Sequence, residues 1–560
     1  MVHAPFPALA AACLLPFALA APAADKRDAS PTVSLPHVTL VGSVASNVAS
    51  FKGIPFAQPP IGGLRLKPPQ AITATLGTLQ ATGTPRACPQ FSAQADTSSL
   101  PNNVISELLD SKVIQAIEND GEDCLTLNVD APSNATSSSK LPVLLWLYGG
   151  GFESGSTQLY DGTSLITAAS PQGKDFIFVA ANYRVGGFGF LPGSAVLKDG
   201  SANIGLLDQR LALQWIADNI EAFGGDPDKV TIFGESAGAM SAFLQMALYS
   251  GDNTYNGKPL FRGAIMDSGS LTPTEPIDSA RAELVYNQVV ENAGCAGVED
   301  ALECLRSLDY QTYLKAANSV PALFGYTGNA LSYIPRPDGT VLAASPDVVA
   351  KEGKFAKVPF ILGDQEDEGT LFALSQTNLT TTEDVVEYFS SVYFQSATKE
   401  QVKAFVDLYP EDPSAGAPFG TGLLNNIYPQ FKRVAAIIGD TTFILLRRNF
   451  LQYASDVPSW TFISSYLNDL PILGTFHGSD VLEVFFLTSG SPATSAHDYY
   501  FNFIYNLDPN NGTAGLINWP RWSESQQALQ FGLTGNKLIA DDFRSEASEF
   551  ISANTEVFYL

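Results

Sequence analysis

The chain has 560 residues, of which 45% are hydrophobic and 16% are charged, and its formal net charge is −26. This composition predicts a folded globular protein with a large core and excludes general disorder. The negative charge argues against nucleic acid as a partner, because phosphate binding requires a basic surface. No proline- or serine-rich linker divides the chain, so we expect a single large domain over residues 28–560.

The N-terminus indicates export. An apolar segment from about Ala8 to Ala20 is too short to cross a bilayer and ends in small residues typical of a cleavage site. We predict a signal peptide over residues 1–20, and Lys26-Arg27 offers a second processing site. No other segment has the length of a transmembrane helix, so the sequence predicts a secreted, extracellular protein.

Four cysteines remain after the signal peptide is removed: Cys88, Cys124, Cys295 and Cys304. An even number in a secreted chain indicates two disulfides, for which three pairings exist. Pairing between sequence neighbours is the simplest. The sequence contains no CxxC motif and no His/Cys cluster, so we expect no metal site, and we predict no cofactor.

Three glycosylation sequons begin at Asn134, Asn378 and Asn511. In a secreted protein each is a candidate glycan acceptor on a surface loop. A sequon can also remain unused, so the sequence does not decide which of the three carry glycans.

Short apolar runs alternate with segments of helical periodicity along the chain. Continuous apolar runs predict strands that are buried on both faces. A helical apolar stripe occupies residues 203–223 and ends at two glycines. The alternation predicts an α/β fold with a parallel sheet and functional residues at the carboxyl ends of its strands. The predicted strands are residues 143–148, 176–181, 230–233, 263–267, 358–362 and 460–463.

Three consecutive glycines, residues 149–151, follow the first predicted strand directly. Glycines allow a substrate to approach the main chain, where N–H groups can stabilise a developing negative charge. The alternative is a flexible turn. Their position at the end of a buried strand favours an oxyanion-binding loop.

The segment Gly-Glu-Ser-Ala-Gly, residues 234–238, lies between a predicted strand and an apolar helical run over residues 239–248. A serine between glycines at such a junction is typical of a nucleophile elbow, which projects the hydroxyl from the sheet. We therefore predict Ser236 as a nucleophile and the N–H of Ala237 as an oxyanion donor. The alternative is an ordinary turn, in a chain with 46 glycines.

An activated serine needs a base, and the chain has four histidines. His3 lies in the predicted signal peptide, and His37 lies near the mature N-terminus. His497 has polar neighbours, whereas His477 lies in a glycine-flanked loop after an apolar run. Elimination therefore favours His477.

The acid partner should lie between the serine and the histidine, because α/β-hydrolases have the order Ser, acid, His. The predicted strand 358–362 leads into a segment with four carboxylates: Asp364, Glu366, Asp367 and Glu368. The alternative is an acidic surface loop. Spacing alone does not choose among the four.

These motifs resemble the type-B carboxylesterase/lipase family. Residues 223–238 resemble its serine signature, and residues 122–125 (EDCL) resemble its second signature. The chain is most similar to the Candida rugosa-type fungal lipases and sterol esterases of this family. The similar segments are residues 51–57, 182–185, 363–372 and 474–477.

The resemblance implies an α/β-hydrolase fold with a mostly parallel central sheet and helices on both faces. It implies a catalytic triad of Ser236, Glu368 and His477, and so selects one of the four carboxylates. It also supports the disulfides Cys88–Cys124 and Cys295–Cys304. The implied oxyanion donors are the N–H groups of Gly150, Gly151 and Ala237, and the implied acyl-binding residues are Phe324, Leu371, Phe372 and Phe476.

In this subfamily the loop closed by the first disulfide, about residues 88–124, carries a movable lid. Residues 103–117 are amphipathic, as expected for a helix that hides an apolar face in water and exposes it at a lipid surface. The alternative is a helix packed permanently on the core. An exposed lid face could support a homodimer, so we expect a monomer or a lid-mediated dimer.

The sequence therefore predicts a serine ester hydrolase, a triacylglycerol lipase or sterol esterase that acts on long-chain acyl esters at a lipid–water interface. The alternative is a carboxylesterase for small or aromatic esters, similar to feruloyl esterases. No tryptophan lies between Cys88 and Cys124, which argues against cholinesterase specificity. A non-catalytic adhesion module of the same family is disfavoured, because the serine and both partners are present.

Overall fold

The computed structural model describes residues 30–91, 117–486, 491–510 and 515–560. The predicted signal peptide, Asn511 and all but the last residue of the predicted lid helix lie outside these ranges. The buried apolar side chains of the described residues form one connected core. None of the helices in these ranges combines the length and the apolar composition needed to cross a membrane.

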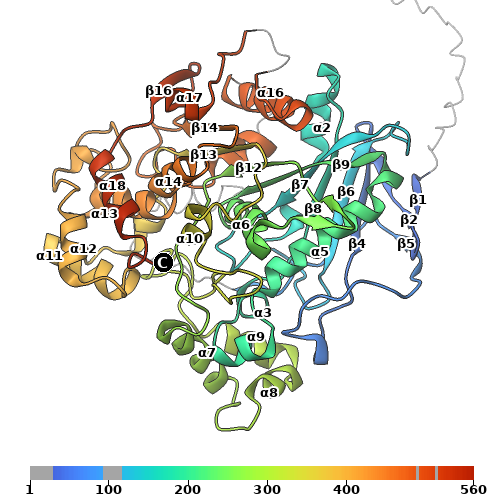
Figure 1. Ribbon diagram of the computed structural model, residues 1–560, viewed down its shortest axis with the longest axis horizontal. Helices are drawn as coiled ribbons and strands as arrows, with labels where there is room; N and C mark the ends of the chain where they lie inside the picture. Colours follow the sequence, from blue (N-terminus) through green and yellow to red (C-terminus); the bar gives the residue numbers. More distant parts are fainter. Residues whose placement is uncertain (1–29, 92–116, 487–490, 511–514) are drawn as a thin grey trace, which may run out of the picture.

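An eleven-stranded sheet runs through the centre of the molecule in the order β16-β15-β14-β13-β12-β9-β7-β8-β6-β4-β3 (Figure 1). The strands from β15 to β8 in this order pair in parallel, and the outer pairs are antiparallel. Parallel neighbours require crossover connections, which place helices over the sheet. The bounds are β3 Ser43–Ala45, β4 Val48–Pro55, β6 Thr126–Pro132, β7 Leu141–Leu147, β8 Ile177–Ala181, β9 Gly225–Glu235, β12 Gly263–Asp267, β13 Phe360–Gln365, β14 Ser459–Ser464, β15 Gln527–Phe531 and β16 Lys537–Ala540.

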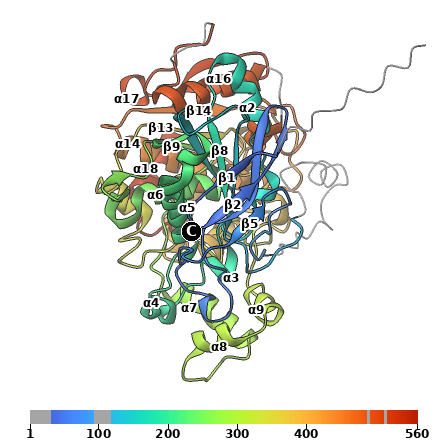
Figure 2. The same ribbon diagram turned by 90° about the vertical axis from the view of Figure 1, so that its right-hand side faces the viewer.

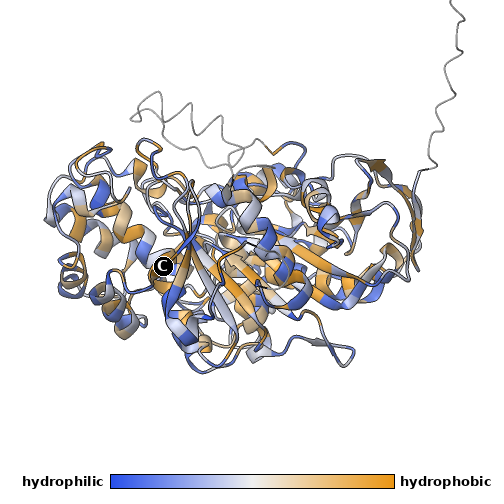
Figure 3. Cartoon of the chain, turned by 90° about the horizontal axis from the view of Figure 1, so that it is seen from above, coloured by the Kyte–Doolittle hydropathy of each residue, from blue (hydrophilic) through white to orange (hydrophobic). Residues whose placement is uncertain are grey.

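All six predicted strands are present, as β7, β8, β9, β12, β13 and β14. Strand β9 begins five residues earlier than predicted, because Gly225 pairs with Leu141 of β7. That extension reads Gly-Asp-Pro-Asp-Lys, so the apolar run does not mark it. Figure 3 shows apolar colours concentrated on the central strands, between helices of mixed character.

Helices cover the sheet on both faces (Figures 1 and 2). The predicted helix 203–223 is α5 (Ile204–Asn219) followed by a short 3₁₀ turn, and α6 (Ala237–Gly251) begins directly after Ser236. The other helices are α2 Thr163–Ala169, α3 Gly186–Gly189, α4 Ser194–Asp199, α7 Ala280–Asn292, α8 Ala301–Ser307, α9 Tyr310–Ala317, α10 Pro346–Lys351, α11 Thr382–Tyr388, α12 Lys399–Val406, α13 Phe431–Gly439, α14 Leu445–Tyr453, α15 Ser479–Val481, α16 Ser491–Asn506, α17 Trp522–Ser525 and α18 Ser545–Asn554.

Two small sheets lie outside the central one. One has three strands in the order β1-β2-β5, and the other pairs β10 with β11. Figure 2 shows the three-stranded sheet in blue, beside the main sheet. The bounds are β1 Thr32–Ser34, β2 Val38–Val41, β5 Gly77–Gln80, β10 Thr254–Tyr255 and β11 Lys258–Pro259.

Candidate active site

Ser236 lies in a tight turn between β9 and α6. Its backbone angles are φ 56° and ψ −125°, which a non-glycine residue adopts only under strain. A β-carbon at Gly234 would come within 2.2 Å of the Gly238 backbone, and one at Gly238 within 2.0 Å of the Leu147 oxygen. Only glycine fits these two positions, so the motif folds as the strand–turn–helix that it predicts.

The structure brings Ser236, His477 and Glu368 together from three separate segments. His477 Nε2 lies 2.8 Å from Ser236 Oγ, and His477 Nδ1 lies 2.6 Å from Glu368 Oε2. The other oxygen of Glu368, Oε1, accepts the Gln365 N–H at 2.7 Å. Glu368 is fully buried, so its carboxylate is fixed in orientation. The arrangement can move a proton from the serine hydroxyl to a ring nitrogen.

The other candidates from the sequence have different partners. Asp364 accepts a hydrogen bond from Arg447 Nε at 2.8 Å. Asp367 accepts main-chain N–H groups of neighbouring loops, among them that of Thr475. His497 Nε2 lies 2.8 Å from the Val484 carbonyl oxygen. Of the four carboxylates that spacing left open, Glu368 is the one in contact with His477.

The glycine loop after β7 lies against Ser236. A β-carbon on Gly149 would stand 2.9 Å from the serine Cβ. The Glu153 and Ser154 N–H groups donate to the Gly150 oxygen at 3.0 Å each, which fixes the loop. Within the described ranges, no protein acceptor receives the N–H groups of Gly150, Gly151 or Ala237. These donors are therefore available to an oxyanion.

Glu153, which the sequence reading did not single out, links this loop to the apolar part of the site. Its Oε2 accepts the Leu323 N–H at 2.8 Å, and the side chain is buried. Burial raises the pKa of Glu153 to about 8. The Leu323 side chain in turn faces Gly151 of the glycine loop.

Aromatic rings surround His477. The Phe372 ring lies 5.1 Å from the imidazole and stacks on Phe324 at 5.8 Å between centroids. Phe443, which sequence reasoning missed, is nearer, at 4.5 Å from the imidazole. Leu371 and Phe476, which also belong to the predicted acyl-binding set, are buried and adjacent in the chain to Phe372 and His477. The site is therefore apolar on the side of these rings.

Three further acids are buried near the triad and were also missed: Glu235, Asp267 and Asp480. Glu235 Oε1 lies 3.4 Å from His477 Nε2. Burial and the negative charges of Asp480 and Glu368 raise the pKa of Glu235 well above its usual value. Burial and Glu368 raise the pKa of Asp480 to about 7. The nearest sequence signals are the place of Glu235 within the serine motif and that of Asp480 three residues after His477.

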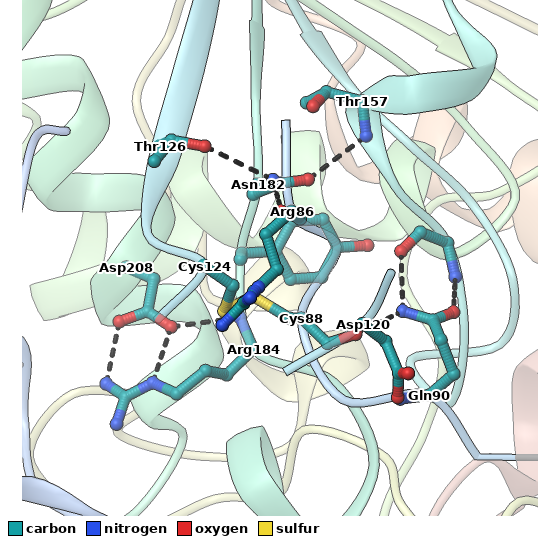
Figure 4. The surroundings of a disulfide bond; sticks show 12 residues. Arg86, Cys88, Gln90, Asp120, Cys124, Thr126, Thr157, Asn182, Arg184 and Asp208 are labelled. Carbon is teal, nitrogen blue, oxygen red and sulfur yellow. Dashed lines mark hydrogen bonds and ion pairs between the residues drawn. A yellow bond between two sulfur atoms is a disulfide. The ribbon is translucent and has the colours of Figure 1, made fainter. Parts of the chain in front are cut away.

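Two disulfides are formed, and both pair sequence neighbours as predicted: Cys88 with Cys124 and Cys295 with Cys304. Figure 4 shows Asn182 beside the first of them. The Asn182 side chain donates to the Arg86 carbonyl at 2.9 Å and accepts the Thr157 N–H at 3.0 Å. These contacts fix the base of the predicted lid loop.

Two of the three predicted sequons lie in the described residues. Asn134 and Asn378 are exposed and stand in turns, where a glycan can be accommodated. The Asn378 side chain donates to the Tyr326 hydroxyl at 3.1 Å. Glycosylation at these positions stays a prediction.

The sheet order, the elbow after β9 and the helices on both faces define an α/β-hydrolase. Residues 29–551 match the profile of the carboxylesterase family, and the chain belongs to this family. It is thus a carboxylic ester hydrolase, which confirms the predicted family, fold and enzyme class.

The chain is similar over nearly its whole length to several fungal lipases. It is 53% identical to "Secreted lipase 1" of Botryotinia fuckeliana, covering 96% of this chain and 95% of the relative. It is also 53% identical to "Secreted triacylglycerol lipase LIP1" of Gibberella zeae (96% and 93%), and 43% identical to "Lipase 4" of Diutina rugosa (95% and 97%). The crystal structure of Aspergillus niger EstA superposes with a TM-score of 0.80 at 29% identity, covering 95% of this chain and 99% of EstA.

Proposed function

We propose that the protein is a secreted lipase that hydrolyses long-chain acyl esters through Ser236, His477 and Glu368. The observation that carries the triad is the hydrogen-bonded series from Ser236 Oγ to His477 at 2.8 Å and from His477 to Glu368 at 2.6 Å. The substrate class is supported by the lipase names of the similar proteins and by the rings around the imidazole.

In the proposed reaction, Ser236 Oγ attacks the ester carbonyl carbon while His477 Nε2 takes the hydroxyl proton. The carbonyl oxygen becomes an oxyanion, which accepts the N–H groups of Gly150, Gly151 and Ala237. The imidazolium then protonates the leaving alkoxide, and the alcohol departs from the acyl-enzyme. Water, deprotonated by the same nitrogen, releases the fatty acid. Glu368 orients the imidazole and stabilises its positive form.

The acyl chain would lie against the aromatic side of the site, formed by Phe324, Phe372 and Phe443. Each methylene buried there contributes about 0.8 kcal/mol of transfer free energy. Long acyl chains should therefore be preferred over short ones. The choice between acylglycerols and sterol esters depends on the alcohol side, which these rings do not define.

The triad is tested by paired substitutions of serine and histidine. Ser236→Ala and His477→Gln should each lower kcat/KM for p-nitrophenyl butyrate by about 10⁴-fold or more, with unchanged urea unfolding. His497→Gln is the matched control, because that buried histidine bonds the Val484 carbonyl and not a triad residue, and activity should stay within about threefold. Retained turnover in Ser236→Ala would refute the triad.

The substrate class is tested on a panel of esters with wild-type protein. We expect kcat/KM to rise with acyl length from butyrate to palmitate, with emulsified triolein and cholesteryl oleate compared directly. A preference for short or feruloyl esters would instead make the protein a carboxylesterase of small substrates. That result would contradict the lipase proposal and leave the triad intact.

The predicted lid and the single domain from residue 28 to 560 belong to the same proposal. The structure describes the base of the lid loop, which the Cys88–Cys124 disulfide closes. A lid over this site would explain how an apolar acyl pocket stays covered in water. Whether lid contacts produce a homodimer is decided by sedimentation of the protein in buffer and in detergent.

A further inference from the structure

A loop beside the active site exposes two adjacent leucines. Leu423 and Leu424 are each 73% exposed, more than any other large hydrophobic side chain in the described ranges. Single exposed hydrophobic residues are common on protein surfaces and need no explanation. Two adjacent exposed leucines need an explanation when hydrogen bonds hold their loop in one conformation. We call residues 419–428 the leucine loop.

The leucine loop is fixed from beneath by a buried ammonium group. Lys432 Nζ donates to Thr421 Oγ1 at 2.6 Å, to the Gly422 oxygen at 2.9 Å and to the Leu424 oxygen at 3.4 Å. The Lys432 side chain is buried. Burying an ammonium is unfavourable unless its hydrogen bonds are satisfied, and here all three N–H groups bind the loop. The leucines are therefore held outward by a specific structure.

Both ends of the leucine loop are joined to the active site. At one end, the Phe419 N–H donates to Asp367 Oδ1 at 2.8 Å, and Asp367 precedes Glu368. At the other, the Tyr428 hydroxyl donates to the Ala373 oxygen at 2.7 Å, and Ala373 follows Phe372, which contacts His477. The exposed pair is thus carried by the segments that hold the triad acid and the acyl-binding rings.

The composition of the loop indicates which kind of surface the two leucines bind. Residues 413–431 contain no Asp, Glu, Lys or Arg, whereas a stretch of this length with the average composition of the chain would hold about three charged side chains. A charged group would oppose entry into a lipid phase, because it would have to be desolvated. The net charge of −26 argues against an anionic surface. Two leucines are also too small for a stable protein interface, which buries about 1,200 Å² or more.

We propose that the leucine loop inserts Leu423 and Leu424 into the surface of a neutral lipid phase and holds the active site against its aggregated ester substrate. The inference rests on the proposed lipase function and adds a fixed anchor, independent of the predicted lid. Its occupant is an uncharged lipid–water interface, such as an acylglycerol droplet.

Binding is measured on inactive protein, so that the lipid is not consumed. Ser236→Ala protein is mixed with phosphatidylcholine-coated triolein droplets, and the bound fraction is determined by flotation. Adding Leu423→Ser and Leu424→Ser should weaken partitioning by at least about tenfold, and the two Leu→Ala changes should give an intermediate loss. The matched control carries Leu284→Ser and Leu533→Ser, which remove side chains 69% and 63% exposed elsewhere, and should bind like the parent.

Activity separates anchoring from chemistry. In otherwise wild-type protein, the leucine-loop variant should hydrolyse dissolved p-nitrophenyl butyrate within about twofold of the parent rate. Its rate on triolein should fall about tenfold at limiting droplet area and recover at saturating area. Inactivity of the wild type on the soluble ester would overturn the proposed function, whereas binding is judged separately on the inactive protein.

Three results would overturn the anchor. One is equal droplet binding by the leucine-loop variant and its parent. Another is an equal loss in the control variant, which would show a general dependence on surface hydrophobicity. The third is a parent dimer in sedimentation that the leucine substitutions convert to monomer, since the pair would then be covered by a second copy of the chain.

Discussion

Two groups of buried acids lie close to the sheet, and they differ in whether a cation accompanies them. In the arginine cluster, Arg447 binds both oxygens of Asp541, at 2.7 and 2.9 Å, and Arg448 adds a contact at 3.1 Å. The acid cluster consists of Glu235, Asp267 and Asp480. No lysine or arginine of the described ranges forms a salt bridge with any of these three acids. Carboxylates are thus buried with cationic partners in the first cluster and without them in the second.

The cations decide the protonation of these acids. Burial raises the pKa of Asp541, but Arg447 and Arg448 lower it more, so the pKa lies below the usual value. Asp480 has no such partner, and burial with the nearby Glu368 charge raises its pKa to about 7. Burial and the negative charge of Asp480 raise the pKa of Asp267 well above its usual value. The arginine cluster therefore favours the ionised form of Asp541, whereas burial without a cation favours the protonated form of the acids in the acid cluster.

The largest expected effect is a difference in kcat between a substitution of Glu368 and one in the neighbouring acid cluster. Glu368→Gln should lower kcat for a soluble ester by about 10³- to 10⁴-fold, because an amide no longer stabilises the imidazolium or fixes its tautomer. Glu235→Gln is the matched control, as Glu235 lies 3.4 Å from the other ring nitrogen. It should cost about tenfold or less. Equal losses of initial rate in the two variants would contradict a special role of Glu368 as the acid partner of His477.

The next effect tests the arginine cluster. Arg447→Met should lower the free energy of unfolding by about 3–5 kcal/mol, because it leaves Asp541 and Asp364 buried with fewer partners. Urea unfolding with intact disulfides measures it. Arg521→Met is the control, since Arg521 is exposed and 3.9 Å from Glu524, and its effect should stay below about 1 kcal/mol. A small loss in Arg447→Met would show that the cluster contributes little.

The acid cluster should appear in the pH dependence of stability. Asp480 has a pKa of about 7 in the folded protein and an ordinary value of 3.8, so the folded state binds its proton more tightly. Unfolding then releases a proton between about pH 4 and 7, and the free energy of unfolding falls as pH rises through that window. In Asp480→Asn, the decrease in the free energy of unfolding over this pH window should be smaller by about 2–4 kcal/mol.

Urea unfolding at pH 4.5 and pH 7.5 measures the difference between wild type and Asp480→Asn. A parallel Asp541→Asn variant should keep the wild-type difference between these two pH values, since the pKa of Asp541 is lowered and its contribution is lost only as pH falls below about 4. Parallel pH profiles for wild type and Asp480→Asn would contradict a retained proton on Asp480.

Much of the fold followed from local patterns in the sequence. Apolar runs predicted the central parallel strands, since a strand covered on both faces must be continuously apolar. The antiparallel edges were not predicted: β16 reads Lys-Leu-Ile-Ala with two exposed ends, and β3 is exposed throughout. Edge strands have one partner and little burial, so their sequences carry a weak pattern.

The candidate site was predictable where chemistry restricts the residue type. Ser236 and His477 follow from a motif and from the scarcity of histidine. Glu368 did not follow from spacing, because four carboxylates occupy five residues and the turn after β13 decides which one meets the imidazole. Phe443 was missed since it lies on a π-helical turn, where the helical period does not hold. Burial raises the pKa of Glu153 and of Asp480, and burial cannot be read from the sequence around either residue.

The smallest effect concerns the Tyr500 hydroxyl, which donates hydrogen bonds to Asp267 of the acid cluster. Tyr500 donates to both oxygens of Asp267, at 2.9 Å each, and this hydrogen bond lowers the pKa that burial raises. Tyr500→Phe should cost about 1 kcal/mol, and its cost at pH 7.5 should be no smaller than at pH 5, because the Tyr500 hydroxyl stabilises the ionised form of Asp267. Tyr499→Phe removes a hydroxyl bonded to the Ile517 carbonyl and should cost the same at both pH values. A smaller cost of Tyr500→Phe at pH 7.5 than at pH 5, measured by urea unfolding beside Tyr499→Phe, would contradict a hydrogen bond that favours the ionised form of Asp267.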